Sequence, residues 1–488
     1  MAEKRTFVGN GYSAGAVVDF IGRCRERNIF PRAFTVVKGG ETAVRFCAAP
    51  YSFAEPMLVY SLSKSFTSVA CGMCIDDGLL SPDTSVTELF SDKIPEPFPE
   101  IARGLKLSDL LSMQSGQGCC AIPQMRFAPD SIAEFFRQPF VTKPGTTFVY
   151  STAASCICAA AAERVSGKKL PDLLYQRMFS LMGEEKPRWF TLRDGQCAGG
   201  TGLYISCNAL EKFGRMLLAG GVYEGKRIVS REYLELATSK HSVDVNNGAP
   251  DWTAGYGFQF WMNARGGFRG DGAYGQLLMV FPEEDTLVTF MGEVGDMAAE
   301  VGEVYRLLDE LSGESGSGGE LERLAQTMYL TKPVEAPAGE LSVEFGENDI
   351  GLRSVSLYGE GLLHAVLGTD YGTRELVCGN GEYILNRVML KYLNPTIITH
   401  DPMLGLEERI SVYAAYERGE DGGYILTLRH ADSAGISIKT VWTFRCLSAM
   451  LHSGIFRQKH RATPRNKGQI KKQSAVAYRR RRFSVDFG

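Results

Sequence analysis

The decisive stretch of this chain reads Val-Tyr-Ser-Leu-Ser-Lys-Ser-Phe-Thr-Ser, residues 59–68. An apolar stripe predicts a helix that begins near Ser61 and ends at Asp76-Asp77-Gly78. Positions i and i+3 share a helix face, so Lys64 Nζ can reach Ser61 Oγ. At a helix N-terminus the amide of Ser61 also points outward, where it can donate to an oxyanion. The pattern is typical of a serine nucleophile activated by a neutral lysine.

The four-residue spacing alone does not identify a site, because ordinary Ser and Lys frequencies predict about two such patterns in a chain this long. The chain of 488 residues contains a second one, Ser166 to Lys169. That second pair follows a predicted helix that is broken by Gly167, which indicates a solvated surface. The first pair opens an apolar helix after a strand-like run, so its context favours a buried site.

Histidine is the usual base for a serine nucleophile, but the first 363 residues contain only His241. A Ser-His-Asp triad in this region has to use that residue. We therefore expect lysine rather than histidine to activate the serine.

The stretch around Ser61 resembles the active-site segment of class C β-lactamases, related carboxylesterases, D-aminopeptidases and aminohexanoate-oligomer hydrolases. The resemblance spans roughly residues 15–300 and implies a β-lactamase-related, penicillin-binding-protein-like serine hydrolase. It implies an α+β fold with a mostly antiparallel sheet flanked by helices. Six further segments resemble the family in the same order along the chain: 76–83, 107–116, 144–151, 199–204, 221–228 and 270–276.

The resemblance also implies roles for individual residues. Tyr150 takes the position of the family tyrosine and is expected to share a proton with Ser61 and Lys64. The backbone N–H groups of Ser61 and Ala273 are expected to form the oxyanion hole. Six further residues are expected to contact the substrate: Thr152, Gly270, Asp271, Gly272, Tyr274 and Gln276.

Two positions depart from the pattern of β-lactamases and penicillin-binding proteins. Thr152 stands where those proteins usually have Asn, and Gly270 stands where they usually have Lys or His. The missing cation removes a partner for a substrate carboxylate, which argues for the esterase and amidase side of the family. The glycines of residues 270–275 also fit a dinucleotide loop, but that loop needs a following helix, and residues 277–281 favour a strand.

We therefore expect a serine hydrolase that cleaves an ester or amide through an acyl-enzyme on Ser61, without a cofactor or metal. The expected partner is a small-molecule ester, amide or peptide. One alternative is a binding or sensor protein of the same fold with little turnover. Another is a genuine β-lactamase or D-Ala-D-Ala-type peptidase.

Composition changes divide the chain into parts. Residues 1–310 are expected to form the hydrolase domain, 311–340 a linker rich in Gly and Ser, and 341–446 a small β-rich domain. The last part, 447–488, contains eleven Lys or Arg and only one acid, Asp486, and is expected to be disordered. This tail is the only basic stretch that could contact nucleic acid. We interpret it as a solvated tail, so no nucleic-acid partner is expected.

Individual elements are predicted from periodicity and turn signals. Helices are expected over 14–29, 153–166 and 207–220, and a hairpin over 34–47. Strands are expected over 255–261, 276–281, 286–291, 341–345, 354–358, 383–385, 410–416, 424–429 and 437–444.

The twelve cysteines are scattered, and Cys71 and Cys74 lack a second pair at zinc spacing. Reduced, buried thiols and a cytoplasmic location are therefore expected, without a disulfide framework or metal site. The N-terminus has no apolar segment typical of a signal peptide, and no stretch predicts a membrane span.

Overall fold

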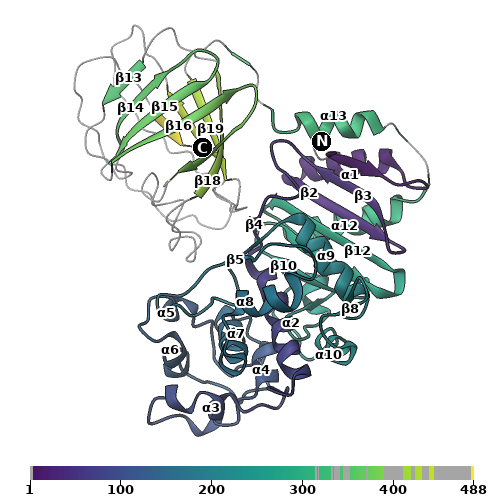
Figure 1. The fold of residues 1–488 in the computed structure, drawn as a ribbon, viewed down its shortest axis with the longest axis vertical. Coiled ribbons are helices and arrows are strands. Elements are labelled where there is room, and N and C mark those ends of the chain that lie inside the picture. The colour runs from purple at the N-terminus through teal and green to yellow at the C-terminus, as the bar shows by residue number, and fades with distance from the viewer. Residues whose placement is uncertain are drawn as a thin grey trace. The chain divides into compact units, whose positions relative to one another are not determined.

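A computed structural model describes residues 4–313, 316, 318–330, 333–334, 341–344, 352–369, 372–388, 410–418, 424–430, 439–444 and 485–487. The chain divides into two compact units, Met1–Ala325 and Gln326–Gly488 (Figure 1). The first unit contains the residues on which the functional prediction rests.

A seven-stranded sheet forms the centre of the first unit, in the order β1-β3-β2-β12-β11-β10-β9. Every neighbouring pair is antiparallel, as predicted. The predicted hairpin is confirmed, because β2 and β3 pair through a turn in which Gly39 and Gly40 have φ values of 59° and 76°. The strands are β1 Thr6–Val8, β2 Ile29–Lys38, β3 Glu41–Cys47, β9 Trp261–Met262, β10 Phe268–Gly272, β11 Gln276–Phe281 and β12 Thr286–Val294.

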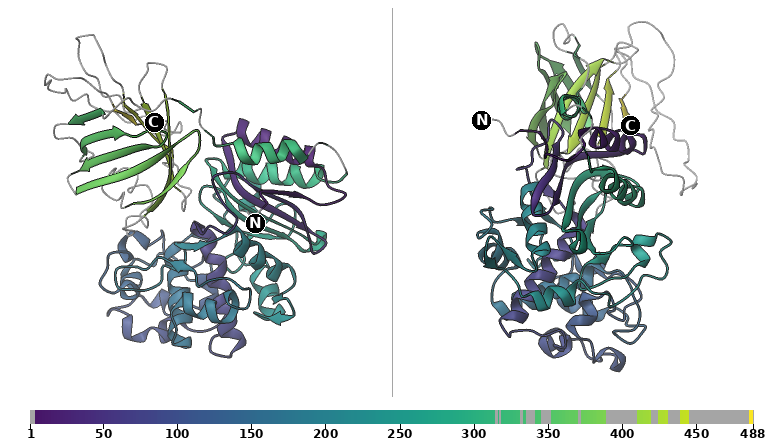
Figure 2. Two further views of the ribbon diagram at one scale, coloured as in Figure 1. Left: turned by 45° about the horizontal axis from the view of Figure 1, so that its top comes forward. Right: turned by 90° about the vertical axis from the view of Figure 1, so that its right-hand side faces the viewer.

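Helices cover both faces of this sheet (Figure 2). On one face, α1 (Ala14–Glu26) and α12 (Met297–Glu310) pack together, and Phe20 of α1 contacts Phe34 and Phe290. On the other face lies α9 (Cys207–Leu218), whose Gly214 approaches Leu278. Strand residues therefore alternate between the two helical layers.

The α9 side continues into a helical region built around α2 (Ser63–Asp76) and α7 (Thr152–Ser166). The predicted helices over 14–29, 153–166 and 207–220 are thus confirmed. The other helices are α3 Val86–Leu89, α4 Leu107–Leu111, α5 Ile122–Met125, α6 Ser131–Arg137, α8 Leu170–Leu174, α10 Arg231–Ala237 and α11 Pro250–Thr253. The short strands are β4 Met57–Leu58, β5 Arg188–Trp189, β6 Leu203–Ile205, β7 Val222–Tyr223 and β8 Lys226–Arg227.

The strand predicted over 255–261 was wrong for most of its length. Only Trp261 belongs to a strand, β9. Gly255 (φ 144°) and Gln259 (φ 65°) turn the backbone out of the extended region. The apolar run therefore packs as an irregular segment, with Tyr256 and Trp261 in an aromatic cluster.

The second unit is a nine-stranded sheet, which agrees with the β-rich character predicted for 341–446. Three strands, β15, β16 and β21, were missed by the prediction. The strands are β13 Leu341–Glu344, β14 Leu352–Tyr358, β15 Leu363–Thr369, β16 Gly372–Asn380, β17 Ile384–Val388, β18 Ile410–Arg418, β19 Tyr424–His430, β20 Lys439–Phe444 and β21 Val485–Phe487.

The predicted linker and tail differ from the structure at two places. A helix, α13 (Gly318–Thr327), lies inside the expected linker, and its buried residues Leu321 and Ala325 belong to the first unit. The tail ends in β21, which pairs with β20, whereas the rest of the tail lies outside the described residues. In the described part of the chain, no helix is both long and apolar enough to cross a bilayer.

Candidate active site

Ser61 lies in a 3-10 turn, Tyr60–Leu62, that leads directly into α2. The preceding residue, Tyr60, has a positive φ of 47°, which is uncommon for a bulky residue. Ser63 fixes this turn, because its hydroxyl donates to the Tyr60 carbonyl at 2.5 Å and accepts from Leu203 N at 3.1 Å. The constrained backbone presents Ser61 half-buried at the start of the helix.

Lys64 is the polar centre of the site, with a side chain that is 1% exposed. Its Nζ lies 3.1 Å from Ser61 Oγ, 3.1 Å from Thr152 Oγ1 and 2.7 Å from the Gly200 carbonyl. A neutral amine has two hydrogens and one lone pair. The Gly200 carbonyl can only accept, so the amine donates one hydrogen to it and the second to one of the two hydroxyls, Ser61 or Thr152. The lone pair of the nitrogen then remains to accept the proton of the other hydroxyl. The geometry suits Lys64 as the base for Ser61.

The environment of Lys64 favours this neutral form. Burial lowers the pKa of Lys64 from its ordinary 10.5 to about 8, and negative charge at Cys120, Cys156 and Asp271 would oppose the shift. Near pH 8 the residue can therefore accept and release a proton readily.

Tyr150 lies beside both residues, one position before the capping residue of α7. It makes a hydrogen bond with Ser61, and Lys64 Nζ lies 4.8 Å from the centre of its ring. Its ring stacks on Trp261 at 5.7 Å and meets Tyr256 edge-on. Burial, and next the charge of Asp271, raise the pKa of Tyr150, so the phenol keeps its proton and can act as a donor.

The segment that carries Tyr150 is held by the end of α4. The carbonyl of Met113 accepts from Val149 N at 2.8 Å, and its sulfur lies 3.2 Å from Ser151 N. Ser151 then caps α7 by accepting from Ala154 N at 3.2 Å. These contacts place Thr152 on the first turn of α7, facing Lys64.

The closing strand β10 approaches the nucleophile turn so closely that it needs glycine. A Cβ on Gly272 would lie 2.1 Å from the Val59 carbonyl, and a Cβ on Gly270 would lie 2.6 Å from Ser65 Oγ. Ser65 therefore occupies the space toward which a lysine or histidine side chain at position 270 would extend. Ala273 follows this strand directly, in the turn to β11.

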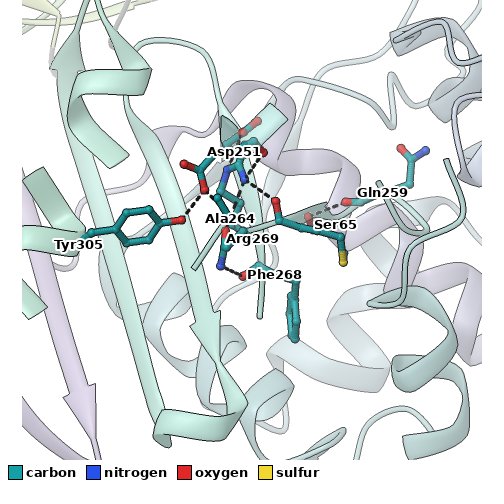
Figure 3. Close-up of polar contacts among 10 residues, drawn as sticks. Ser65, Asp251, Gln259, Ala264, Phe268, Arg269 and Tyr305 are labelled. Carbon is teal, nitrogen blue, oxygen red and sulfur yellow. Dashed lines mark hydrogen bonds and ion pairs between the residues drawn. The ribbon is translucent and has the colours of Figure 1, made fainter. Parts of the chain in front are cut away.

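Asp271 points to the opposite face of β10 from Gly270 and Gly272. Its carboxylate accepts from Arg269 Nε at 3.1 Å, and Arg269 is fully buried. Arg269 Nη1 donates to the carbonyls of Asp251 (2.9 Å) and Met262 (3.1 Å). Figure 3 shows Arg269 beside Asp251. Burial raises the pKa of Asp271, and the arginine opposes that shift. The Arg269–Asp271 pair thus supports this wall of the site.

Tyr274 and Gln276 lie on either side of the turn glycine, Gly275. Gln276 Nε2 donates to the carbonyls of Tyr274 and Gly292, both at 3.0 Å, so its amide braces the turn. The Tyr274 ring packs edge-on against Tyr60 at 5.1 Å. The turn that bears Ala273 is therefore tied to the turn that bears Ser61.

The structure separates the two S-x-x-K patterns. Ser166 Oγ donates to the Ala162 carbonyl, whereas Lys169 Nζ binds Glu163 and the Gly195 carbonyl. This second pair therefore has no Ser–Lys contact of the kind seen in the first.

His241 lies in the segment after α10. Its ring stacks on Phe258 at 4.2 Å, and its Nε2 lies 2.8 Å from the Leu236 carbonyl. These contacts do not form a triad with Ser61, whose hydroxyl faces Lys64.

The Gly200 carbonyl was missed as a site group by sequence reasoning. Residues 199–204 were noted only as a family-like segment, because a backbone acceptor carries no side-chain signal. A Cβ on Gly200 would lie 2.8 Å from the Thr152 carbonyl, so a glycine here is what lets this carbonyl reach Lys64.

Within the described ranges, His, Cys, Asp and Glu form no group that could hold a metal, and the cysteines are free thiols. The glycine pattern at 270–275 is followed by β11 and not by a helix, so the context of a dinucleotide loop is missing.

Comparisons with known proteins concern the family and the fold of the first unit. The family model described as Beta-lactamase matches residues 25–308. The 6-aminohexanoate-dimer hydrolase of Paenarthrobacter ureafaciens is 26% identical over an alignment of 285 residues, and the match covers 52% of this chain and 71% of that protein.

Two solved structures share the fold. A Bacteroides dorei DSM 17855 protein provisionally named a beta-lactamase has a TM-score of 0.52 and 18% identity, over 61% of this chain and 99% of its own. EstCE1, a hydrolase with promiscuous acyltransferase activity, has a TM-score of 0.50 and 15% identity, over 61% and 97%. At such identities the likeness concerns the fold alone.

Proposed function

Because this chain belongs to the beta-lactamase family, we propose that it cleaves an ester or amide bond through an acyl-enzyme on Ser61. It is a serine hydrolase, and one relative is named a 6-aminohexanoate-dimer hydrolase. The observation that carries the proposal is Lys64 Nζ, buried and within 3.1 Å of the Ser61 hydroxyl oxygen.

Acylation begins when Ser61 Oγ attacks the substrate carbonyl carbon and its proton moves to neutral Lys64 Nζ. The carbonyl oxygen becomes an oxyanion, which the N–H groups of Ser61 and Ala273 are proposed to bind. When the tetrahedral intermediate collapses, the bond to the leaving group breaks. The leaving group takes the phenol proton of Tyr150, which regains a proton from the Lys64 ammonium.

Deacylation repeats these steps with water as the nucleophile. Water attacks the acyl carbon and gives a proton to Lys64, and the bond between that carbon and Ser61 Oγ then breaks. Ser61 recovers its proton, and the acid product leaves. The same donors serve both halves of the cycle, so one set of groups suffices.

The wall at position 270 guides the choice of substrate. Gly270 supplies no cation for a substrate carboxylate, and Ser65 and Leu62 fill the space in front of it. We therefore propose neutral esters and amides rather than β-lactams as substrates. A 6-aminohexanoate dimer belongs in the test panel because one relative is named for hydrolysing it.

The test is steady-state turnover of p-nitrophenyl esters, 6-aminohexanoate dimer, D-amino-acid amides and nitrocefin. Ser61→Ala should abolish turnover of every active substrate. Ser166→Ala is the matched control, since it removes the serine of the same spacing elsewhere, and it should leave turnover unchanged. A stable adduct without product release would instead support a sensor of the same fold, and turnover by Ser61→Ala would overturn the proposal.

A further inference from the structure

Gln259 is a buried residue in a strained backbone conformation. It is 2% exposed, and its φ of 65° lies in the left-handed region that non-glycine residues seldom adopt. Such conformations persist where the surrounding contacts fix them, and they gather at functional sites. The contacts of Gln259 identify what it holds.

Gln259 joins three helices through its own polar atoms. Its carbonyl accepts from Ser65 Oγ at 3.0 Å, a contact drawn in Figure 3, and its Oε1 accepts from Ser155 Oγ at 2.5 Å. Its Nε2 donates to the carbonyls of Leu111 (2.9 Å) and Leu110 (3.3 Å), and its backbone N donates to Leu111 at 3.0 Å. One residue therefore ties α2, α7 and α4 together.

These attachment points lie next to the groups that surround the Lys64 amine. Ser65 follows Lys64 on α2, and Ser155 lies three residues after Thr152 on α7. The Ser155 side chain also packs on Gly200, where an added Cβ would lie 2.9 Å from Ser155 Cβ. Thr152 and Gly200 both bind Lys64; Thr152 lies on the turn of α7 that Gln259 anchors, and Gly200 packs against that turn.

We propose that Gln259 is a positioning residue that sets the spacing between Lys64 on α2 and its partners on and beside α7. The inference rests on the proposed function, because it assigns Gln259 a task in activating Ser61. It gives the amide a role beyond stability, since loss of the amide leaves α7 free to shift relative to α2.

The expected consequence follows from the burial of Lys64. Removing the Gln259 amide takes the Oε1 acceptor from Ser155 Oγ and a side-chain donor from the Leu110 and Leu111 carbonyls in a dry interior, although the backbone N of residue 259 still donates to Leu111. If the turn of α7 relaxes to recover hydrogen bonds, Thr152 moves away from Lys64 and water can enter. Because burial is what lowers the pKa of Lys64, hydration returns that pKa toward its ordinary value.

The test compares Gln259→Met with Gln117→Met. Gln117 is a matched control because it is 1% exposed and its Nε2 donates at 2.8 Å to the carbonyl of Phe135 on α6 (Ser131–Arg137) rather than to α2, α4 or α7. For Gln259→Met we expect kcat to fall about tenfold or more through misplacement, with KM little changed. We also expect the rising limb of the kcat/KM–pH profile to move to higher pH. Gln117→Met should lose stability without moving that limb.

Ser155→Ala provides a second variant, because it removes a single contact of Gln259 and should move the limb in the same direction. An unchanged limb in a folded Gln259→Met would overturn the inference, as would an unchanged limb in Ser155→Ala if Gln259→Met does not fold. Ser61→Ala, measured in parallel, distinguishes the two proposals. Turnover by Ser61→Ala overturns the proposed function, whereas inactive Ser61→Ala with an unmoved limb overturns only the role of Gln259.

Discussion

The amine of Lys64 lies 3.1 Å from the hydroxyl oxygen of Ser61 at the start of one buried helix. We predict that Lys64→Ala lowers kcat/KM on a p-nitrophenyl ester by about 10²–10⁴-fold, the usual contribution of a general base. Lys169→Ala removes the exposed lysine of the second S-x-x-K pattern and should leave the rate unchanged. A Lys64→Ala variant that keeps more than about a tenth of the activity would contradict this role.

The pH dependence of the reaction should report the shifted pKa of Lys64. The amine accepts a proton only when neutral, so kcat/KM should rise with pH and reach half of its maximum near the pKa of about 8. Since the pKa of Tyr150 is raised, its phenol should keep its proton and the plateau should persist into alkaline solution. A profile already flat between pH 6 and 8, measured with a neutral substrate, contradicts this expectation.

Tyr150→Phe should separate leaving groups by their need for a proton. A p-nitrophenolate leaves without protonation, so its ester should lose little activity. An amide nitrogen must be protonated, and amide hydrolysis should fall by about 10²-fold or more. The ratio of the two rates, taken in one enzyme preparation, is the readout. Equal losses on both substrates would assign Tyr150 to packing or to serine activation instead.

The contact between Gly270 and Ser65 should appear as coupling between two substitutions. Gly270→Ala places a Cβ 2.6 Å from Ser65 Oγ and should cost about 1–3 kcal/mol of unfolding free energy as overpacking. Removing that oxygen in the double variant Gly270→Ala, Ser65→Ala should recover part of the loss. Denaturant unfolding of both single variants and the double variant measures the coupling. Strict additivity would show that the two residues do not compete for space.

The buried Arg269–Asp271 pair should stabilise the closing strand far more than a surface pair does. Arg269→Met leaves the Asp271 carboxylate without its charge partner and should lower the unfolding free energy by about 3–5 kcal/mol. Arg103→Met, which breaks an exposed pair with Glu100, should change it by less than about 1 kcal/mol. Similar losses in the two variants would mean that water reaches the Arg269 site.

The contact between Ser61 and Lys64 and the main helices were accessible from sequence because their signals are local or ordered. The spacing from Ser61 to Lys64 fixes a shared helix face, and apolar periodicity marks α1, α7 and α9. Tyr150 came from the family resemblance rather than from its own neighbours. Its placement rests on Met113, a contact between segments that no local pattern encodes.

The remainder depends on tertiary contacts. Residues 255–261 contain aromatic residues that favour a strand, and a strand was predicted there. The backbone turns at Gln259 instead, because contacts with three helices fix that residue. Asp271 was predicted as a substrate contact, and no local pattern indicates that its carboxylate accepts from the buried Arg269. The carbonyl of Gly200 became a partner of Lys64 only when α2, α7 and the 199–204 segment packed together.

The most direct test of the acyl-enzyme on Ser61 is a rapid-quench reaction with a p-nitrophenyl ester, followed by peptide mapping. The mechanism predicts a burst of p-nitrophenol of about one equivalent per enzyme when deacylation is slow. The acyl group should then be found on the peptide that contains Ser61. An acyl group on any other residue, or turnover by Ser61→Ala at the wild-type rate, would contradict it.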